Sequence, residues 1–200
     1  MRAVGIVLAA GEGRRMGAPK ALLRRPDGTG WAAHAAAVAR AGGCADVLVT
    51  LGPRAGQVRP GLPGGVVALD VPDWRTGRAA GLARALRHPL AADADAVLVT
   101  LVDLPDVGAG DVRAVLAAGA AGGPGALVRA VHDGRGGHPV LVGRAHLPRA
   151  LELAGAGRGL RELLAGPGVR TVEVAGAVRD ADVPADLPPG TLLPPPVPGR

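Results

Sequence analysis

The chain has 200 residues, 48% of them apolar, and a formal net charge of +6, so it is long enough for one domain with its own core. Because arginine supplies all but one of its 23 basic side chains, and these are scattered along the sequence, we expect no nucleic-acid partner. It has no serine and one cysteine, Cys44, which excludes a serine hydrolase, an intramolecular disulfide and a four-cysteine zinc site.

The first predicted elements alternate between strands and helices along the chain. Short apolar runs predict strands, and alanine-rich stretches that end at Gly or Pro predict helices. In chain order these are a strand at 3–10, a helix at 31–43, strands at 46–52 and 65–70, a helix at 78–88, a strand at 95–105 and a helix at 109–120. This alternation is typical of an α/β fold with a parallel sheet and right-handed crossovers.

The second half of the chain is less regular. We expect two strands joined by a glycine-rich turn within 125–143, helices at 144–154 and 158–165, and a last strand at 169–174. Proline is frequent from Pro188 onward, so we expect a single domain over 1–187 and a disordered tail over 188–200. Since Phe and Tyr are absent, the core must consist of small aliphatic side chains that let helices approach the sheet closely.

Targeting signals of the common kinds are missing from the sequence. No apolar run reaches the roughly 18 residues that a membrane-spanning helix needs. Residues 1–8 lead directly into the first predicted strand, without a basic and then apolar leader. We therefore expect no membrane partner and a cytoplasmic location.

The stretch Leu8–Lys20, LAAGEGRRMGAPK, connects the first predicted strand to the only lysine of the chain. Its three glycines allow sharp turns and a close approach of backbone N–H groups to an oxygen-rich ligand, and its basic side chains add positive charge. A P-loop is excluded because Ala21 follows Lys20, where Ser or Thr is required. A dinucleotide fingerprint is excluded because Met16 stands where the third glycine is required.

The same stretch resembles the signature of the MobA-like nucleotidyltransferases, which move a nucleoside monophosphate from an NTP onto a phosphorylated acceptor. The resemblance implies a three-layer, mostly parallel, Rossmann-like sheet of the nucleotide-diphospho-sugar transferase type. It implies that the ammonium of Lys20 reaches between the α- and β-phosphates, and that Lys20, Arg15 and Asp103 are catalytic. The residues expected to bind the nucleotide are Leu8, Ala9, Ala10, Gly11, Gly13, Arg15, Gly17, Lys20, Gly77 and Arg78.

Triphosphate chemistry requires a divalent cation, and we expect Mg²⁺ to be held by carboxylates at the carboxyl edge of the sheet. Asp103 ends the most apolar predicted strand and is similar to the metal-binding Asp of the family's Asp-x-Pro segment. The stretch RDADVPADL at 179–187 resembles the element that completes this metal site, so Asp182, with Asp180 next, is the second expected ligand. The alternatives are a turn-capping role for Asp103 and a solvated acidic turn near the C-terminus.

The acceptor side has its own motif. The sequence Gly-His-Pro-Val at 137–140 resembles a segment of the molybdenum cofactor cytidylyltransferase branch, which implies that His138 binds the acceptor. The alternative is a histidine fixed by backbone contacts at a tight turn. The stretch at 157–164 resembles a helix start of the same branch, so Arg158, with Arg161, is expected to face an anion.

Two details bear on which branch the chain is nearest. Ala9-Ala10-Gly11, rather than Ala-Gly-Gly, favours the cytidylyl branch over the guanylyl branch. That branch has several serines after a Trp-x-x-Gly segment, whereas here Arg78 and two alanines follow Gly77. The loss of these hydroxyls affects nucleotide identity and activity unless Arg78 substitutes for them electrostatically.

Together these residues predict metal-assisted transfer of a nucleoside monophosphate, with CTP favoured, to a phosphorylated acceptor such as the molybdopterin cofactor, with release of pyrophosphate. Two alternatives remain open. Relatives with a similar loop resemble a nicotine blue oxidoreductase, which implies an NAD(P)H-dependent redox enzyme. The missing serines also fit a non-catalytic nucleotide-binding module.

Overall fold

The centre of the computed structural model, which describes residues 1–175 and 180–195, is a single mixed sheet. Within these residues seven strands stand in the order β3-β2-β1-β4-β6-β5-β7. They are β1 (Ala3–Ala9), β2 (Asp46–Leu51), β3 (Val66–Asp70), β4 (Ala96–Leu101), β5 (Leu127–His132), β6 (Arg135–Gly143) and β7 (Arg170–Glu173). Strand β6 runs antiparallel to β4 and β5, and the other neighbours are parallel.

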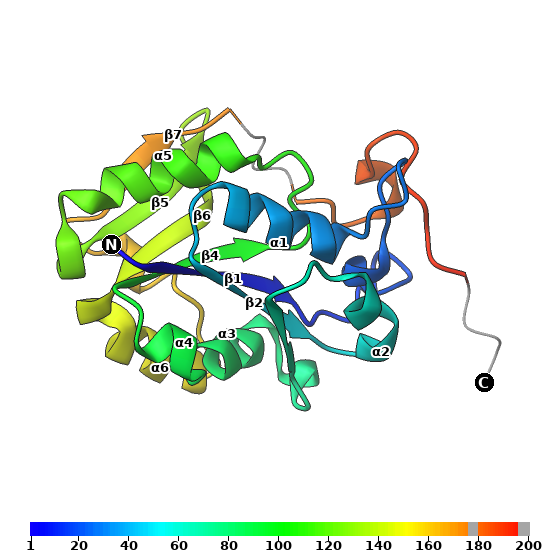
Figure 1. Ribbon diagram of the computed structural model, residues 1–200, viewed down its shortest axis with the longest axis horizontal. Coiled ribbons are helices and arrows are strands. Elements are labelled where there is room, and N and C mark those ends of the chain that lie inside the picture. Colours follow the sequence, from blue (N-terminus) through cyan, green and yellow to red (C-terminus); the bar gives the residue numbers. More distant parts are fainter. Residues whose placement is uncertain (176–179, 196–200) are drawn as a thin grey trace.

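Helices cover both faces of the sheet, which gives three layers (Figure 1). Helices α1 (Trp31–Ala41) and α5 (Ala109–Ala120) lie on one face. Helices α3 (Arg78–Leu86), α4 (Pro89–Ala92) and α6 (Leu147–Gly155) lie on the other, and the short α2 (Ala55–Val58) follows β2. The predicted three-layer, mostly parallel α/β fold is confirmed.

The core has the small aliphatic character that the composition predicts. A Cβ atom added at Gly119 of α5 would lie 2.1 Å from Leu141 Cδ2, and one added at Gly42 would lie 2.3 Å from the Val112 side chain. Glycine is therefore what lets α5 approach the sheet and the end of α1 so closely. Cys44 is buried beside these elements, and burial raises the pKa of its thiol to about 12, so it is a packing residue rather than a nucleophile.

One local expectation is corrected. The helix expected at 158–165 is only a turn and a short 3-10 helix at Leu163–Ala165. Gly157, with a φ of +76°, lies between α6 and this turn. In the expected tail over 188–200, Leu192 exchanges two backbone hydrogen bonds of 3.0 and 2.8 Å with Arg24, and residues 196–200 lie outside the described residues.

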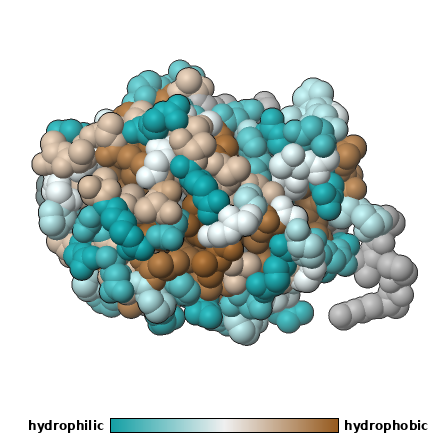
Figure 2. All heavy atoms as spheres, in the orientation of Figure 1, coloured by the Kyte–Doolittle hydropathy of each residue, from teal (hydrophilic) through white to brown (hydrophobic). Residues whose placement is uncertain are grey.

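Figure 2 shows one face of the molecule, on which hydrophobic areas lie between hydrophilic ones. Among the described residues, no helix is both long and apolar enough to span a bilayer.

Candidate active site

The loop after β1 and the residue after β4 meet at one edge of the sheet. Strands β1 and β4 are parallel and in register, with Leu8 opposite Leu101, and the Val102 N–H donates to the Leu8 carbonyl at 3.2 Å. Both strands therefore present their carboxyl ends to the same space, where ligands of open α/β sheets bind. A cavity of about 370 Å³ lies there.

Close backbone contacts fix the shape of the loop after β1. Gly13 has a φ of +68°, and a Cβ atom on it would lie 1.8 Å from the Ala18 carbonyl oxygen. A Cβ atom on Gly52, just beyond β2, would lie 2.0 Å from the Ala10 carbonyl oxygen. Any side chain at either glycine would push the loop out of this path. The loop conformation thus depends on Gly13, within the motif, and on Gly52, which lies 39 positions after Gly13 in the sequence.

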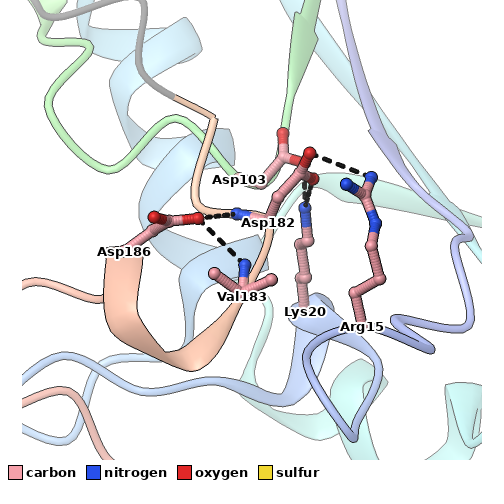
Figure 3. A network of polar contacts seen from close by, with 6 residues as sticks. All are labelled: Arg15, Lys20, Asp103, Asp182, Val183 and Asp186. Atoms are coloured by element: carbon pink, nitrogen blue, oxygen red, sulfur yellow. Dashed lines mark hydrogen bonds and ion pairs between the residues drawn. The ribbon is translucent and has the colours of Figure 1, made fainter.

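The central feature of the cavity is a group of opposite charges (Figure 3). The Lys20 Nζ atom lies 2.6 Å from Asp103 Oδ2 and 2.7 Å from Asp182 Oδ1, and Arg15 lies 2.9 Å from Asp182 Oδ2. Only 14% of the Lys20 side chain and 10% of the Asp103 side chain are exposed. The lysine and the two acids that the sequence predicts separately thus lie in a single group of charges. This group is called the Lys20 cluster and consists of Arg15, Lys20, Asp103 and Asp182.

The contacts within the Lys20 cluster favour its charged forms. Burial alone would lower the pKa of Lys20, but its hydrogen bonds from Nζ to Asp103 and Asp182 outweigh burial, and the pKa is raised. The hydrogen bond from Lys20 lowers the pKa of Asp182. Lys20 and Asp182 therefore stay ionised near neutral pH, so this pair is a fixed ammonium beside a fixed carboxylate.

Asp182 is brought to the cluster from far along the chain. The Asp186 carboxylate accepts hydrogen bonds from the N–H groups of Asp182 and Val183 at 2.9 and 3.0 Å, which shapes this turn (Figure 3). The Ala181 N–H donates to the Asp103 backbone carbonyl at 3.1 Å, so the turn is tied directly to the end of β4. Asp186 and Ala181 are positioning residues that the sequence reasoning missed.

The same cluster has an oxygen suited to a divalent cation. Asp103 Oδ1 is buried and, within the described part of the chain, has no hydrogen-bond partner. An ionised buried oxygen without a donor is a natural ligand for a hard cation such as Mg²⁺ or Mn²⁺. No three His, Cys, Asp or Glu side chains among the described residues are arranged as a ready metal-binding group. The pKa of Asp180 is raised, mainly by desolvation and next by the negative charge of Asp103. Asp180 therefore lies near the cluster.

Helix α3 forms a further wall of the cavity. Gly77, with a φ of +119°, precedes α3, and Arg78 occupies its first position. Trp74 and Arg75 lie on the preceding turn, with the Arg75 guanidinium 4.4 Å from the centre of the Trp74 ring. The start of α3 therefore presents free N–H groups and a cation to the cavity, which suits an anionic ligand.

The family model of the MobA-like NTP transferase domain matches residues 5–174 of the chain. The chain belongs to this family of nucleotidyltransferases. The match spans the loop after β1 and the end of β4, and it ends before the turn that contributes Asp182.

Individual relatives agree with this membership. A probable molybdenum cofactor guanylyltransferase of Rhodopirellula baltica is 34% identical over 113 residues, which are 56% of this chain and 54% of the relative. The chain thus spans about half the length of the curated relative it matches.

Solved structures match over nearly the whole chain. Rv0371c from Mycobacterium tuberculosis has a TM-score of 0.76 at 29% identity, covering 93% of this chain and 95% of its own. A complex of Rv0371c with manganese has a TM-score of 0.73 at 28% identity, covering 93% and 96% of the two chains. The 2-C-methyl-D-erythritol 4-phosphate cytidylyltransferase of Thermus thermophilus has a TM-score of 0.65 at 25% identity, covering 93% and 95%.

Most of the predicted site residues of this MobA-like chain line the cavity. Those that line it are Leu8, Ala10, Gly11, Gly13, Arg15, Lys20, Gly77, Arg78, Asp103 and Asp182. Two predicted nucleotide-binding residues are not part of the lining: Ala9 is buried in the core, and Gly17 is exposed at the far end of the loop. We refer to the residues that line this cavity as the nucleotide side.

Several lining residues were missed from the sequence. Thr50, on β2, accepts a hydrogen bond from the Ala9 N–H at 3.2 Å, so its hydroxyl fixes the end of β1. A polar residue in an otherwise apolar strand is the signal that identifies it. Trp74, Arg75 and Gly81 also line the cavity. Trp74 and Arg75 come from the turn before α3 and Gly81 from α3 itself, a tertiary arrangement that local spacing does not reveal.

His138, which the sequence predicts to bind the acceptor, and its neighbour Arg129 are together called the acceptor side; neither is among the residues that line the cavity. His138 lies on β6, in the part of the strand where its register with β5 is irregular. On β5 this irregularity falls between Arg129 and Val131. The Arg129 Nη2 atom donates to the Gly136 carbonyl at 2.7 Å, while its buried Nε–H has no partner in the described residues. Although part of the His138 side chain reaches solvent, desolvation of the imidazole, followed by the charge of Arg78, lowers its pKa to about 4. His138 is therefore neutral near pH 7.

Arg158, the second predicted acceptor residue, does not line the cavity. It lies in an exposed turn after α6, where its guanidinium donates to Glu162 at 2.8 Å. The expected helix start that would have directed it inward is absent from this part of the described chain. Arg129, which is half-buried, is the cation near His138 instead, and the sequence reasoning did not identify it.

Proposed function

We propose that this MobA-like protein transfers a nucleoside monophosphate from an NTP to a phosphorylated acceptor, in a reaction that requires Mg²⁺ and releases pyrophosphate. The observation that supports this proposal is the meeting of Lys20, Asp103 and Asp182 within 2.7 Å contacts in one cavity. An ammonium, two carboxylates and a glycine-shaped loop are the groups that triphosphate chemistry requires.

In the proposed reaction the residues of the nucleotide side bind and orient the triphosphate. Lys20 and Arg15 would pair with phosphate oxygens, and N–H groups of the loop after β1 and of the first turn of α3 would donate to others. Asp103 and Asp182 would hold the metal ion, which supplies neutralisation of phosphate charge when it is bound. The manganese complex of the similar protein Rv0371c is consistent with a divalent cation in this fold.

Catalysis then depends on positioning rather than on a covalent intermediate. An acceptor phosphate oxygen attacks the α-phosphorus, the new O–P bond forms, and the bond between the α-phosphorus and the bridging oxygen breaks. Pyrophosphate leaves with that bridging oxygen, and its charge is met by Lys20 and Arg15. His138 and Arg129 would bind the acceptor, since a neutral imidazole and a guanidinium both donate hydrogen bonds to oxygen.

The nucleotide and the acceptor are the finer parts of the proposal. We favour CTP because of the Ala-Ala-Gly sequence at 9–11 and the similarity to a cytidylyltransferase, and we favour the molybdopterin cofactor because of the Gly-His-Pro-Val segment. The matched curated relative is a probable guanylyltransferase, so GTP is the direct competitor. A cytoplasmic location also stays a prediction.

The test is a pyrophosphate-release assay of CTP, GTP, ATP and UTP against molybdopterin and a small set of phosphorylated acceptors, with and without Mg²⁺. We expect release only when one NTP, one acceptor and the metal are all present. Consumption of NADPH without pyrophosphate would favour the redox alternative. Nucleotide binding by calorimetry without pyrophosphate for every acceptor would favour a non-catalytic binding module.

A further inference from the structure

The Lys20 ammonium stands between the two carboxylates that would hold the metal ion (Figure 3). It is 2.6 Å from one and 2.7 Å from the other, so it makes a short hydrogen bond to each. Arg15 engages the second oxygen of Asp182 at 2.9 Å. Of the four oxygens of these carboxylates, only Asp103 Oδ1 has no partner within the described residues. A cation that uses both carboxylates must therefore displace Lys20 or Arg15.

The charges of the cluster lead to the same conclusion. Asp103 and Asp182 contribute two negative charges, and Lys20 and Arg15 contribute two positive charges, so the cluster has no net charge to attract a dication. Because the side chains of Lys20 and Asp103 are largely buried, water does not readily replace their mutual hydrogen bonds. Releasing the ammonium is favourable only when another anion is available to it.

We propose that Lys20 is an internal counter-ion that blocks divalent-metal binding until the phosphates of an NTP draw the ammonium away. This inference rests on the proposed function in taking Asp103 and Asp182 to be the metal ligands. When the phosphates arrive, the ammonium moves to them and both carboxylates become free for the cation. By thermodynamic linkage, metal and nucleotide then each bind more tightly in the presence of the other. The empty protein does not retain metal in an unproductive complex.

The first experiment measures the binding of Mn²⁺ alone to the nucleotide-free, full-length protein by electron paramagnetic resonance of free Mn²⁺. Removal of the ammonium in Lys20→Met leaves the carboxylates with a net negative charge, and we expect Mn²⁺ to bind about tenfold more tightly, or more. Arg14→Met is the matched control. Arg14 lines the same cavity but pairs with Glu12 at 2.7 Å rather than with the two acids, and we expect a change of less than about twofold.

A second experiment needs no substitution. Since Lys20 is the only lysine, labelling with ¹⁵N-lysine gives one side-chain ammonium resonance in the intact wild-type protein. We expect Mg²⁺ alone to leave this resonance in place, and Mg²⁺ with inorganic tripolyphosphate to shift it and to speed its hydrogen exchange. A resonance that moves as far with Mg²⁺ alone overturns the proposal, as does Lys20→Met that binds Mn²⁺ no more tightly than wild type.

The counter-ion role and the proposed enzymatic function can fail separately in these experiments. If Lys20→Met gains no affinity for Mn²⁺ while the wild type still releases pyrophosphate, the counter-ion role fails and the transferase function stands. If Mn²⁺ affinity rises as expected but no NTP and acceptor give pyrophosphate, the counter-ion role stands and the transferase function fails.

Discussion

The nucleotide side and the acceptor side are built from different parts of the sheet. Lys20 and Asp103 follow the parallel strands β1 and β4, whose carboxyl ends meet at one edge, so strand order brings these two together. The turn that contributes Asp182 is added by its own hydrogen bond to the end of β4. His138 and Arg129 instead lie within the antiparallel pair β5 and β6, where the register is irregular. The first region is set by strand order, and the second is set by a local distortion of pairing.

This difference affects how charge is held in each region. On the nucleotide side each charged group of the Lys20 cluster has an opposite charge within 2.9 Å. On the acceptor side the Arg129 Nε–H has no partner among the described residues, and His138 is kept neutral by desolvation and by nearby cations. The Lys20 cluster is thus internally compensated, whereas the acceptor side has a donor left over for a ligand. Substitutions in the two regions should therefore have different effects.

The largest effect is expected at Asp103. In Asp103→Asn the buried carboxylate loses its charge, so Lys20 loses a charged partner and, under the proposed function, the metal would lose a ligand. We expect pyrophosphate release to fall by about 100-fold or more, because charge stabilisation of this kind contributes several kcal/mol. The measurement is the initial rate of release at saturating NTP.

Asp106→Asn is the matched control for this substitution. Asp106 is three positions further along and exposed, and it does not cap α5, because the Asp111 carboxylate accepts from the Gly108 N–H at 2.8 Å instead. We expect Asp106→Asn to keep at least about half of the activity. Equal losses in the two variants would show that the carboxylate at 103 has no special role.

The next largest effect is expected from a pair of glycines in the loop after β1. Gly17→Ala places a Cβ at a φ of +79° with nothing within 4 Å, so it should lower the free energy of unfolding by about 1 kcal/mol. Gly13→Ala adds a clash at 1.8 Å with the Ala18 carbonyl, and we expect a loss of about 3 kcal/mol. Urea denaturation of both variants measures the difference. Equal losses would mean that the loop relaxes around the added methyl group.

These glycines also show how much of the site the sequence predicts. The motif at 8–20 identifies Gly13 and the positively charged Lys20 because it is a continuous stretch with a defined place after a strand. Asp103 follows from the same rule, since the carboxyl ends of parallel strands share an edge. What the motif does not reveal is that Gly52 must also lack a side chain, because that contact joins two different loops.

On the acceptor side local reasoning identified one residue and missed another. His138 stands in a recognisable segment, but Arg129 comes near it only through the irregular pairing of β5 and β6. Arg158 was expected at the site because a helix was expected at 158–165, and the structure has only a turn and a short 3-10 helix there. Long-range register and broken helices depend on the packing of the whole chain, which is why the sequence alone does not reveal them.

A smaller effect tests Arg129 against Arg158. Arg129→Met removes a half-buried guanidinium near His138, and we expect the KM for the acceptor to rise about tenfold while the KM for the NTP changes little. Arg158→Met removes an exposed guanidinium that pairs with Glu162, and we expect both KM values to stay within about twofold of wild type. Steady-state kinetics with the acceptor identified in the pyrophosphate screen give both values. If Arg158→Met raised the KM for the acceptor more than Arg129→Met does, the acceptor would bind at the turn after α6 instead.

The smallest effect concerns pH and the neutral state of His138. Its pKa is lowered from 6.5 to about 4 in the folded protein, so between these pH values the unfolded chain binds a proton that the folded chain does not. The stabilising contribution is complete above pH 6.5 and is lost as the pH falls towards 4. Because part of the side chain reaches solvent, we expect the loss to be about 1 kcal/mol, and His138→Gln should remove it from a series of urea denaturations.

His132 provides a control of opposite sign for that measurement. The hydrogen bond between its ring and the Val174 carbonyl raises its pKa, so its contribution is complete below pH 6.5 and is lost as the pH rises through the folded value. His132→Gln should therefore make the stability fall more steeply on acidification, while His138→Gln makes the fall shallower. If both variants change the slope in the same direction, desolvation of His138 is not what governs its protonation, and the acceptor side would present a cationic imidazole instead of a neutral one.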